Sequence, residues 1–153
     1  MELMKFSGKV NFSSPGRDAC SVSGIIPNVP ALADTTGMIV KLRIGGATVS
    51  FTLDGKGRAK SSSSAFMLSL KPSTVNKLTR KREFPGGPVS FKATLKNGSW
   101  VNEWQDEGID SSIDAKDAPV TFVTDLYFNH RVYTATTEAL CLSKAGQMAK
   151  FRK

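Results

Sequence analysis

Hydrophobic and polar residues alternate along most of this chain, and this pattern restricts the fold more than any other feature. The alternation is clear in residues 4–12, 38–44, 49–53, 66–70 and 89–95. Successive side chains of a β-strand point to opposite faces, so each segment is expected to bury one face and expose the other. Strands of α/β proteins are instead apolar on both faces. The pattern therefore predicts an all-β protein built from antiparallel strands.

Turn residues separate the expected strands. Gly45-Gly46, for example, lies between two alternating segments and supplies the positive φ angles of a two-residue hairpin turn. The expected strands span residues 5–12, 18–26, 38–44, 47–53, 65–71, 89–95, 120–128 and 131–142. Eight or nine strands in a chain of 153 residues are typical of an antiparallel β-sandwich. We therefore predict a single β-sandwich domain over residues 1–153.

One short helix is expected, from Ser99 to Glu107. Ser99 can accept a hydrogen bond from a free backbone N–H at the start of a helix, and Gly108 can end it. Trp100 and Trp104 are four residues apart and would share one face of this helix. The spacing favours a place in the core, and an aromatic platform for sugar rings is the alternative.

The chain contains few of the residues that catalysis or metal binding uses. His130 is the single histidine, and it lies in an expected turn. A catalytic triad needs a base held against a nucleophile, and a zinc site needs four ligands. We therefore predict a protein that is not an enzyme and that uses no metal or cofactor. Cys20 and Cys141 are too few for a disulfide scaffold, and the sequence leaves open whether they are free or joined.

The formal charge of the chain is +8, and it is unevenly distributed. Residues 1–98 hold 15 Lys and Arg against 5 Asp and Glu, whereas residues 99–153 hold 6 against 8. For these clustered cations a solvated loop is expected, and contact with an anionic polymer, either nucleic acid or acidic polysaccharide, is the alternative. The candidate contacts are Lys77, Arg80, Lys81 and Arg82 in one loop, Lys92 and Lys96 on the next strand, and Lys41 and Arg43 on an earlier strand.

Six acidic residues gather in the second part of the chain. They are Glu103, Asp106, Glu107, Asp110, Asp114 and Asp117. Calcium favours carboxylates on a flexible loop, but this spacing does not match a calcium-binding loop. A solvated surface is expected, and a patch that contacts the basic half of another copy is the alternative. Head-to-tail contacts of that kind produce rings or filaments.

Several segments together carry a resemblance to a known kind of domain. They are residues 9–12 with Asp18 and Gly24, then residues 49–57, 91–98, 106–109, 133–136 and 144–146. In these segments the chain resembles an uncharacterised β-sandwich domain of large secreted or surface-exposed multidomain proteins of environmental bacteria. The resemblance implies an extracellular or cell-surface location and a role in structure or binding. It implies no activity and no catalytic residue.

Two functions follow as hypotheses. The first is a non-enzymatic structural or assembly module that acts through contacts with other copies or with neighbouring domains. The second is a binding module for an anionic polymer that uses the basic face. No membrane span is expected with either, because no window of the sequence is apolar over about 18 residues.

Overall fold

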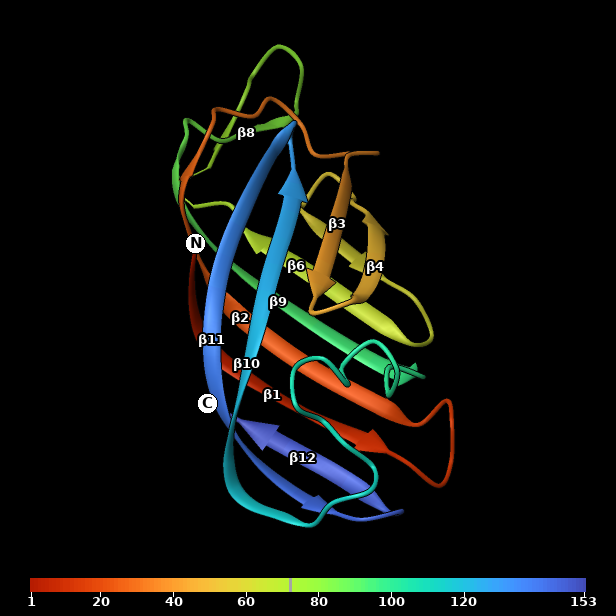
Figure 1. Cartoon of the computed structure of the whole chain (residues 1–153). Coiled ribbons are helices and arrows are strands. Elements are labelled where there is room, and N and C mark those ends of the chain that lie inside the picture. The colour runs from red at the N-terminus through yellow and green to blue at the C-terminus, as the bar shows by residue number, and fades with distance from the viewer. Residues whose placement is uncertain (72) are drawn as a thin grey trace.

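The computed structural model describes residues 1–71 and 73–153, without the side chain of residue 82. The described residues form strands, turns and loops, and none of them is helical (Figure 1). The strands are β1 (Glu2–Asn11), β2 (Asp18–Val29), β3 (Ile39–Ile44), β4 (Ala47–Thr52), β5 (Arg58–Lys60), β6 (Ser64–Ser69), β7 (Thr74–Val75), β8 (Arg82–Glu83), β9 (Gly87–Gly98), β10 (Ala115–Phe128), β11 (Arg131–Lys144) and β12 (Met148–Arg152). The predicted all-β class with antiparallel pairing is confirmed.

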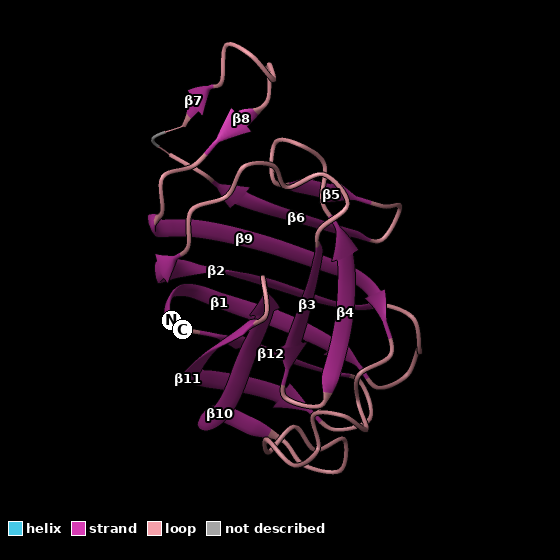
Figure 2. Cartoon of the chain, turned by 90° about the horizontal axis from the view of Figure 1, so that it is seen from above, coloured by secondary structure: helices cyan, strands magenta, loops and turns pink. Residues whose placement is uncertain are grey.

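Ten of these strands form one antiparallel sheet, in the order β4-β3-β10-β11-β12-β1-β2-β9-β6-β5. The sheet is rolled so that β1, β2, β9 and β6 cross behind β10 and β11, and the two edge strands β4 and β5 contact each other (Figure 1). It is therefore nearly closed into a barrel. Strands β7 and β8 form a separate hairpin that stands apart from the sheet (Figure 2).

The predicted sandwich of two sheets is not confirmed, because all ten main strands belong to a single sheet. The alternating pattern requires only that each strand has one buried face. A sandwich and a rolled sheet both satisfy that requirement. What distinguishes them is long-range pairing, and here β12 pairs with both β1 and β11 and so joins the two ends of the chain into one sheet.

The predicted helix is not confirmed either, because residues 101–108 form turns. The N–H of Trp104 does donate to the carbonyl of Trp100, at 3.0 Å, as in a helix. Only one such bond forms before the pattern changes, and Gly108 ends the turns with a φ of 90°. Ser99 accepts a hydrogen bond from the N–H of Gly16 at 2.9 Å instead of capping a helix.

The core fills the inside of the rolled sheet and is rich in aromatic rings. Phe6, Phe122 and Phe151 lie with ring centroids between 4.7 and 5.4 Å apart, and Trp104 meets the last two edge to face. Trp104 has no exposed surface, so the predicted core role of this residue is confirmed. Its loop, residues 99–114, crosses the lower end of the molecule in Figure 1.

Both cysteines are buried and free, which settles the question that the sequence left open. Cys20 lies on β2 and Cys141 on β11, and these strands are separated in the sheet by β1 and β12. Burial raises the pKa of the Cys20 thiol to about 12 and also raises that of Cys141. Two buried thiols that resist ionisation behave as small apolar core residues.

Turns with positive φ join the strands as the sequence indicates. Gly45 has a φ of 55° and Gly46 does not share it, which is the pattern of a type II′ turn. Asn129 and His130 both have positive φ, the pattern of a type I′ turn, between β10 and β11. His130 is exposed in that turn, as expected. Among the described residues no helix is long and apolar enough to cross a membrane.

Candidate anion-binding surface

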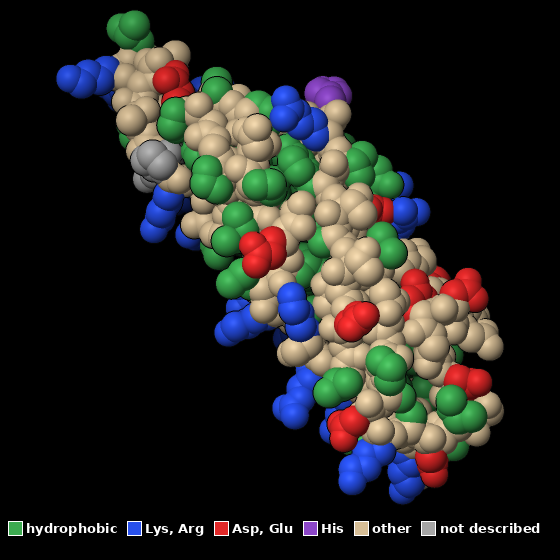
Figure 3. All heavy atoms as spheres, turned by 60° about the vertical axis from the view of Figure 1, so that its left-hand side comes forward, with side chains coloured by type: hydrophobic (Ala, Val, Ile, Leu, Met, Phe, Trp, Pro, Cys, Tyr) green, Lys and Arg blue, Asp and Glu red, His purple; other side chains and the backbone are tan. Residues whose placement is uncertain are grey.

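The outer face of half of the sheet carries a dense set of cations, which we call the basic wall. It is formed by β12, β1, β2, β9, β6 and β5, which are consecutive in the sheet. The residues of the basic wall are Lys5, Lys9, Arg58, Lys60, Lys92, Lys96, Lys150 and Arg152. In Figure 3, Lys and Arg side chains project along the lower-left margin of the molecule.

The strand register arranges these cations in rows across the sheet. One row contains Lys150, Lys9 and Lys96, with Ala19 of β2 between the last two. Because neighbouring strands lie ~4.8 Å apart, the backbones of Lys9 and Lys96 are about 10 Å apart. A second row, from Lys5 across β2 to Lys92 and then across β6 to Arg58, has the same spacing.

Lys9 and Lys150 are direct cross-strand partners, so two like charges stand opposite each other. Such pairs destabilise a sheet. None of the eight cations forms an ion pair with another described residue, and the one exposed carboxylate on these strands is Glu2. The charge of the basic wall is therefore left to solvent and to ligands.

Hydroxyl groups fill the spaces between the cations. Ser7, Ser21 and Thr94 are aligned across β1, β2 and β9, and Ser23 lies between Lys5 and Lys92. Among the described side chains that point outward from these strands, none is aromatic. The surface thus offers charge and hydrogen bonds, and it offers no ring on which a nucleic-acid base could stack.

Of the basic residues predicted from the sequence, only Lys92 and Lys96 belong to this surface. Lys41 and Arg43 lie on β3, in the opposite half of the sheet. Arg43 is paired with the buried Asp125, and the ammonium of Lys41 lies 5.7 Å from the ring centroid of Tyr127. These two cations are therefore separated from Lys92 and Lys96.

The predicted basic loop forms the exposed tip of the β7–β8 hairpin. Lys77 and Arg80 are exposed there, and the side chain of Arg82 lies outside the described part of the chain. Lys81 is 3.0 Å from the carboxylate of Asp34. Hydrogen bonds from the Thr36 N–H and from Lys81 lower the pKa of Asp34 to about 2, which keeps this ion pair charged. The loop is thus a third basic region, distinct from the basic wall.

The acidic residues lie in the loop of residues 99–114 and at the start of β10. Glu103, Asp106, Asp114 and Asp117 are exposed, whereas Asp110 and Glu107 are half-buried. Asp110 and Asp114 bind backbone N–H groups of Ser112 and Ala145, so they stabilise turns. No group of three or more described Asp, Glu, His or Cys side chains lies close enough together to hold a metal ion.

Trp104 offers nothing to a ligand, since it has no exposed surface and its Nε1 donates to the carbonyl of Ile44 at 2.8 Å. Trp100 is half-buried, with its ring centroid 5.1 Å from that of Trp104. A pair of exposed rings, as an aromatic platform needs, is therefore not present.

Sequence reasoning missed six of the eight residues of the basic wall. Lys5 and Lys9 come from the first strand, and Lys150 and Arg152 come from the last. The available signal was the alternation of residues 148–152, in which Ala149 and Phe151 are buried and Lys150 and Arg152 are exposed. The strands expected from the sequence end at residue 142 and do not include this segment. The chain matches no protein-family model, no curated protein and no solved structure.

Proposed function

We propose that this protein is a non-enzymatic binding module for an acidic polysaccharide, held on the basic wall. The observation that carries the proposal is the set of eight cations without a carboxylate partner, which the four strands β12, β1, β9 and β5 place on a surface of six consecutive strands. Because like charges such as Lys9 and Lys150 reduce the stability of the sheet, the arrangement is better explained by a ligand that neutralises it. The extracellular or cell-surface location expected from the sequence is part of the proposal.

A polysaccharide suits this surface better than a nucleic acid. Proteins that bind single strands stack the bases on exposed aromatic rings, and the described outer face of these strands has none. Double-stranded DNA is read by a helix or a narrow ribbon that enters a groove, and a broad sheet face cannot enter one. The hydroxyl groups of Ser7, Ser21 and Thr94 are instead suited to the hydroxyl groups of sugars.

The proposal is tested by fluorescence anisotropy with labelled heparin, single-stranded DNA and neutral dextran at low salt. We expect heparin to bind, dextran not to bind, and DNA of equal charge to bind more weakly. Tighter binding of DNA would assign the basic wall to nucleic acid. No binding of any anionic polymer would overturn the proposal.

Variants locate the binding surface. Lys92→Gln with Lys96→Gln removes two exposed charges from the basic wall, and Lys41→Gln with Lys116→Gln removes two exposed charges from the opposite half of the sheet. The net charge of the two double variants is the same, so general attraction changes equally. We expect the first pair to weaken heparin binding by about tenfold or more and the second pair to have little effect.

Assembly with other copies is a second candidate, which a separate observation favours. Leu140 and Leu142 on the outer face of β11 are 52% and 53% exposed, and Ile113 in the loop before β10 is 50% exposed. Exposed apolar groups of this kind are often covered by a partner. Light scattering across protein concentration tests this: concentration-dependent mass that Leu142→Ser abolishes would support assembly, and a constant monomer mass would contradict it.

A further inference from the structure

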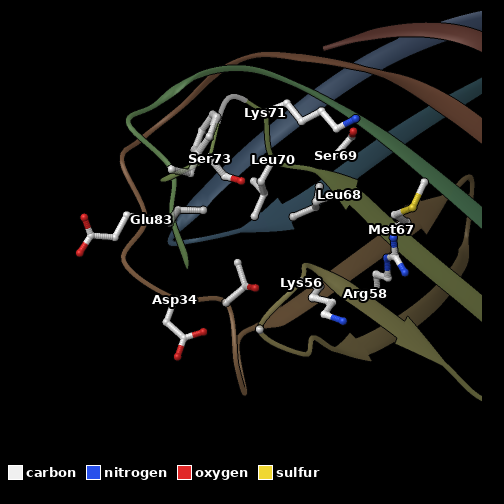
Figure 4. A pocket seen from close by; sticks show the side chains of 14 residues that line it. Asp34, Lys56, Arg58, Met67, Leu68, Ser69, Leu70, Lys71, Ser73 and Glu83 are labelled. Carbon is white, nitrogen blue, oxygen red and sulfur yellow. The ribbon is translucent and has the colours of Figure 1, made fainter. Parts of the chain in front are cut away.

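A pocket of about 310 Å³ lies next to the basic wall. It is lined by the loop after β2, the turn between β4 and β5, the end of β6 and the strand β8 (Figure 4). Met67 and Arg58 follow Lys92 in its row across the sheet, on β6 and β5, and both residues also line the pocket. A chain that lies along this row would therefore reach the pocket.

Hydrogen bonds hold the pocket in shape. Leu32 and Phe84 exchange two backbone hydrogen bonds, of 2.9 and 2.8 Å, which join the loop after β2 to β8. The carboxylate of Asp54 accepts the N–H groups of Lys56 and Arg58 at 2.8 and 2.9 Å. The hydroxyl of Thr35 donates to the carbonyl of Asp54 at 2.6 Å. The walls are thus preformed, so little ordering is needed when a ligand binds.

The charges at the rim are unbalanced in favour of an anion. The carboxylate of Asp34 is paired with Lys81 at 3.0 Å, whereas the carboxylate of Glu83 accepts the neutral amide of Asn76 at 2.7 Å and keeps its charge. Lys56, Arg58 and Lys71 also line the pocket, and none of the three forms an ion pair with another described residue.

Figure 4 shows how these charges are arranged around the pocket. Asp34 and Glu83 lie on one side of the view, and Lys56 and Arg58 lie together on the other side. The cationic side is therefore the side beside Met67, where the pocket meets the basic wall.

The floor of the pocket is apolar. Leu68 and Phe84 are buried beneath it, Leu70 is half-buried, and Met67 is 39% exposed. A preformed cavity of this size with an apolar floor and a few charged groups is typical of small-molecule sites. A sugar ring with a carboxylate has the matching chemistry, because its C–H face is apolar and its acid group can reach the cations at the rim.

We propose that this pocket binds one acidic sugar, the terminal unit of the polysaccharide, while the following units lie on the basic wall. The inference rests on the proposed function, because it is the basic wall that makes a polymer the expected ligand. The carboxylate lies at Lys56 and Arg58, and the ring lies on Leu70 and Met67. This arrangement favours chain ends over internal segments.

The test uses backbone amide chemical shifts of the whole chain, with glucuronate as the probe and with glucose and acetate as controls. We expect glucuronate to shift the amide signals of Gly57, Leu68 and Ser69. Glucose lacks the charge and acetate lacks the ring, so neither should shift them at the same concentration. Lys56→Gln with Arg58→Gln should weaken glucuronate binding about tenfold or more, and Lys41→Gln with Lys116→Gln should leave it unchanged.

The outcomes separate this inference from the proposed function. If heparin binds the basic wall but glucuronate shifts no pocket amide, the pocket inference is overturned and the proposed function stands. Equal shifts from acetate would also overturn it, because the ring would then contribute nothing. If glucuronate binds in the pocket but no polymer binds, the small-acid site stands and the proposed function is overturned.

Discussion

Replacing Trp104 by alanine should destabilise this protein strongly. The residue has no exposed surface, so the full cost of removing a buried tryptophan applies, about 3–5 kcal/mol of unfolding free energy. The substitution also removes the edge-to-face contacts of the indole ring with Phe122 and Phe151, and it removes the hydrogen bond from the indole N–H to the carbonyl of Ile44. For a domain of this length each kcal/mol corresponds to ~2–4 °C, so the melting temperature should fall by about 6–20 °C.

Two further variants separate the contributions of the buried ring, its hydrogen bond and its loop to the unfolding free energy. Trp104→Phe keeps a ring in the core but removes the bond to Ile44, so it should cost less, about 1–3 kcal/mol. Trp100→Ala removes a half-buried ring from the same loop and should cost about 1–2 kcal/mol. Melting followed by circular dichroism measures all three. A melting temperature of Trp104→Ala within ~2 °C of the parent would refute the core assignment.

Three other residues give predictions of stability. Asp18→Asn should cost about 2–4 kcal/mol in urea unfolding, because the buried carboxylate accepts the N–H groups of Asn11 and Trp100 and an amide has one acceptor oxygen. Burial of Asp125 would raise its pKa, but hydrogen bonds from Thr134 and Arg43 and the Arg43 charge together lower it. Asp125 therefore stabilises the folded protein above the ordinary pKa of aspartate, and this stabilisation is lost as the pH falls through the pKa of Asp125 in the folded protein. Arg43→Gln should reduce the free energy of unfolding at pH 7 and make it depend less on pH in the acid range. An unchanged pH dependence in the acid range would contradict this. Burial, with the charge of Asp106, raises the pKa of Glu107, whose Oε2 is buried without a partner among the described residues. The protein then loses stability as the pH rises from the ordinary pKa of glutamate to the raised pKa of Glu107 in the folded protein. Glu107→Gln should therefore have a higher melting temperature than the parent at pH 7. A lower melting temperature would refute the reasoning.

The local pattern predicted the strands better than it predicted how they assemble. The hairpin expected over residues 38–44 and 47–53 is present as β3 and β4, with the turn at Gly45 and Gly46. Alternation identifies the buried face of each strand, and that face is a local property. The closure of one sheet depends on pairing between β1 and β12, which lie at opposite ends of the chain. No local pattern carries that information.

The candidate site was predicted poorly for the same reason. Cations that are close along the chain, such as Lys77 and Lys81, are the visible signal in the sequence, and they lie in a separate hairpin. The cations of the basic wall come from four strands, and Lys9 and Lys150 become neighbours only through the β1–β12 pairing. The expected helix of residues 99–107 was wrong in form, but its tryptophan at 104 is in the core as the apolar spacing indicated.

The salt dependence of heparin binding tests the account most directly. Contact of four to eight charges predicts that the affinity falls roughly 50- to 2,000-fold between about 50 and 200 mM salt, as counterions compete for the ligand. Lys92→Gln with Lys96→Gln should reduce the slope of log K against log salt by about 1.4, and Lys41→Gln with Lys116→Gln should leave it unchanged. Equal slopes for the two double variants, or binding that is insensitive to salt, would contradict the proposal that the basic wall holds an acidic polymer.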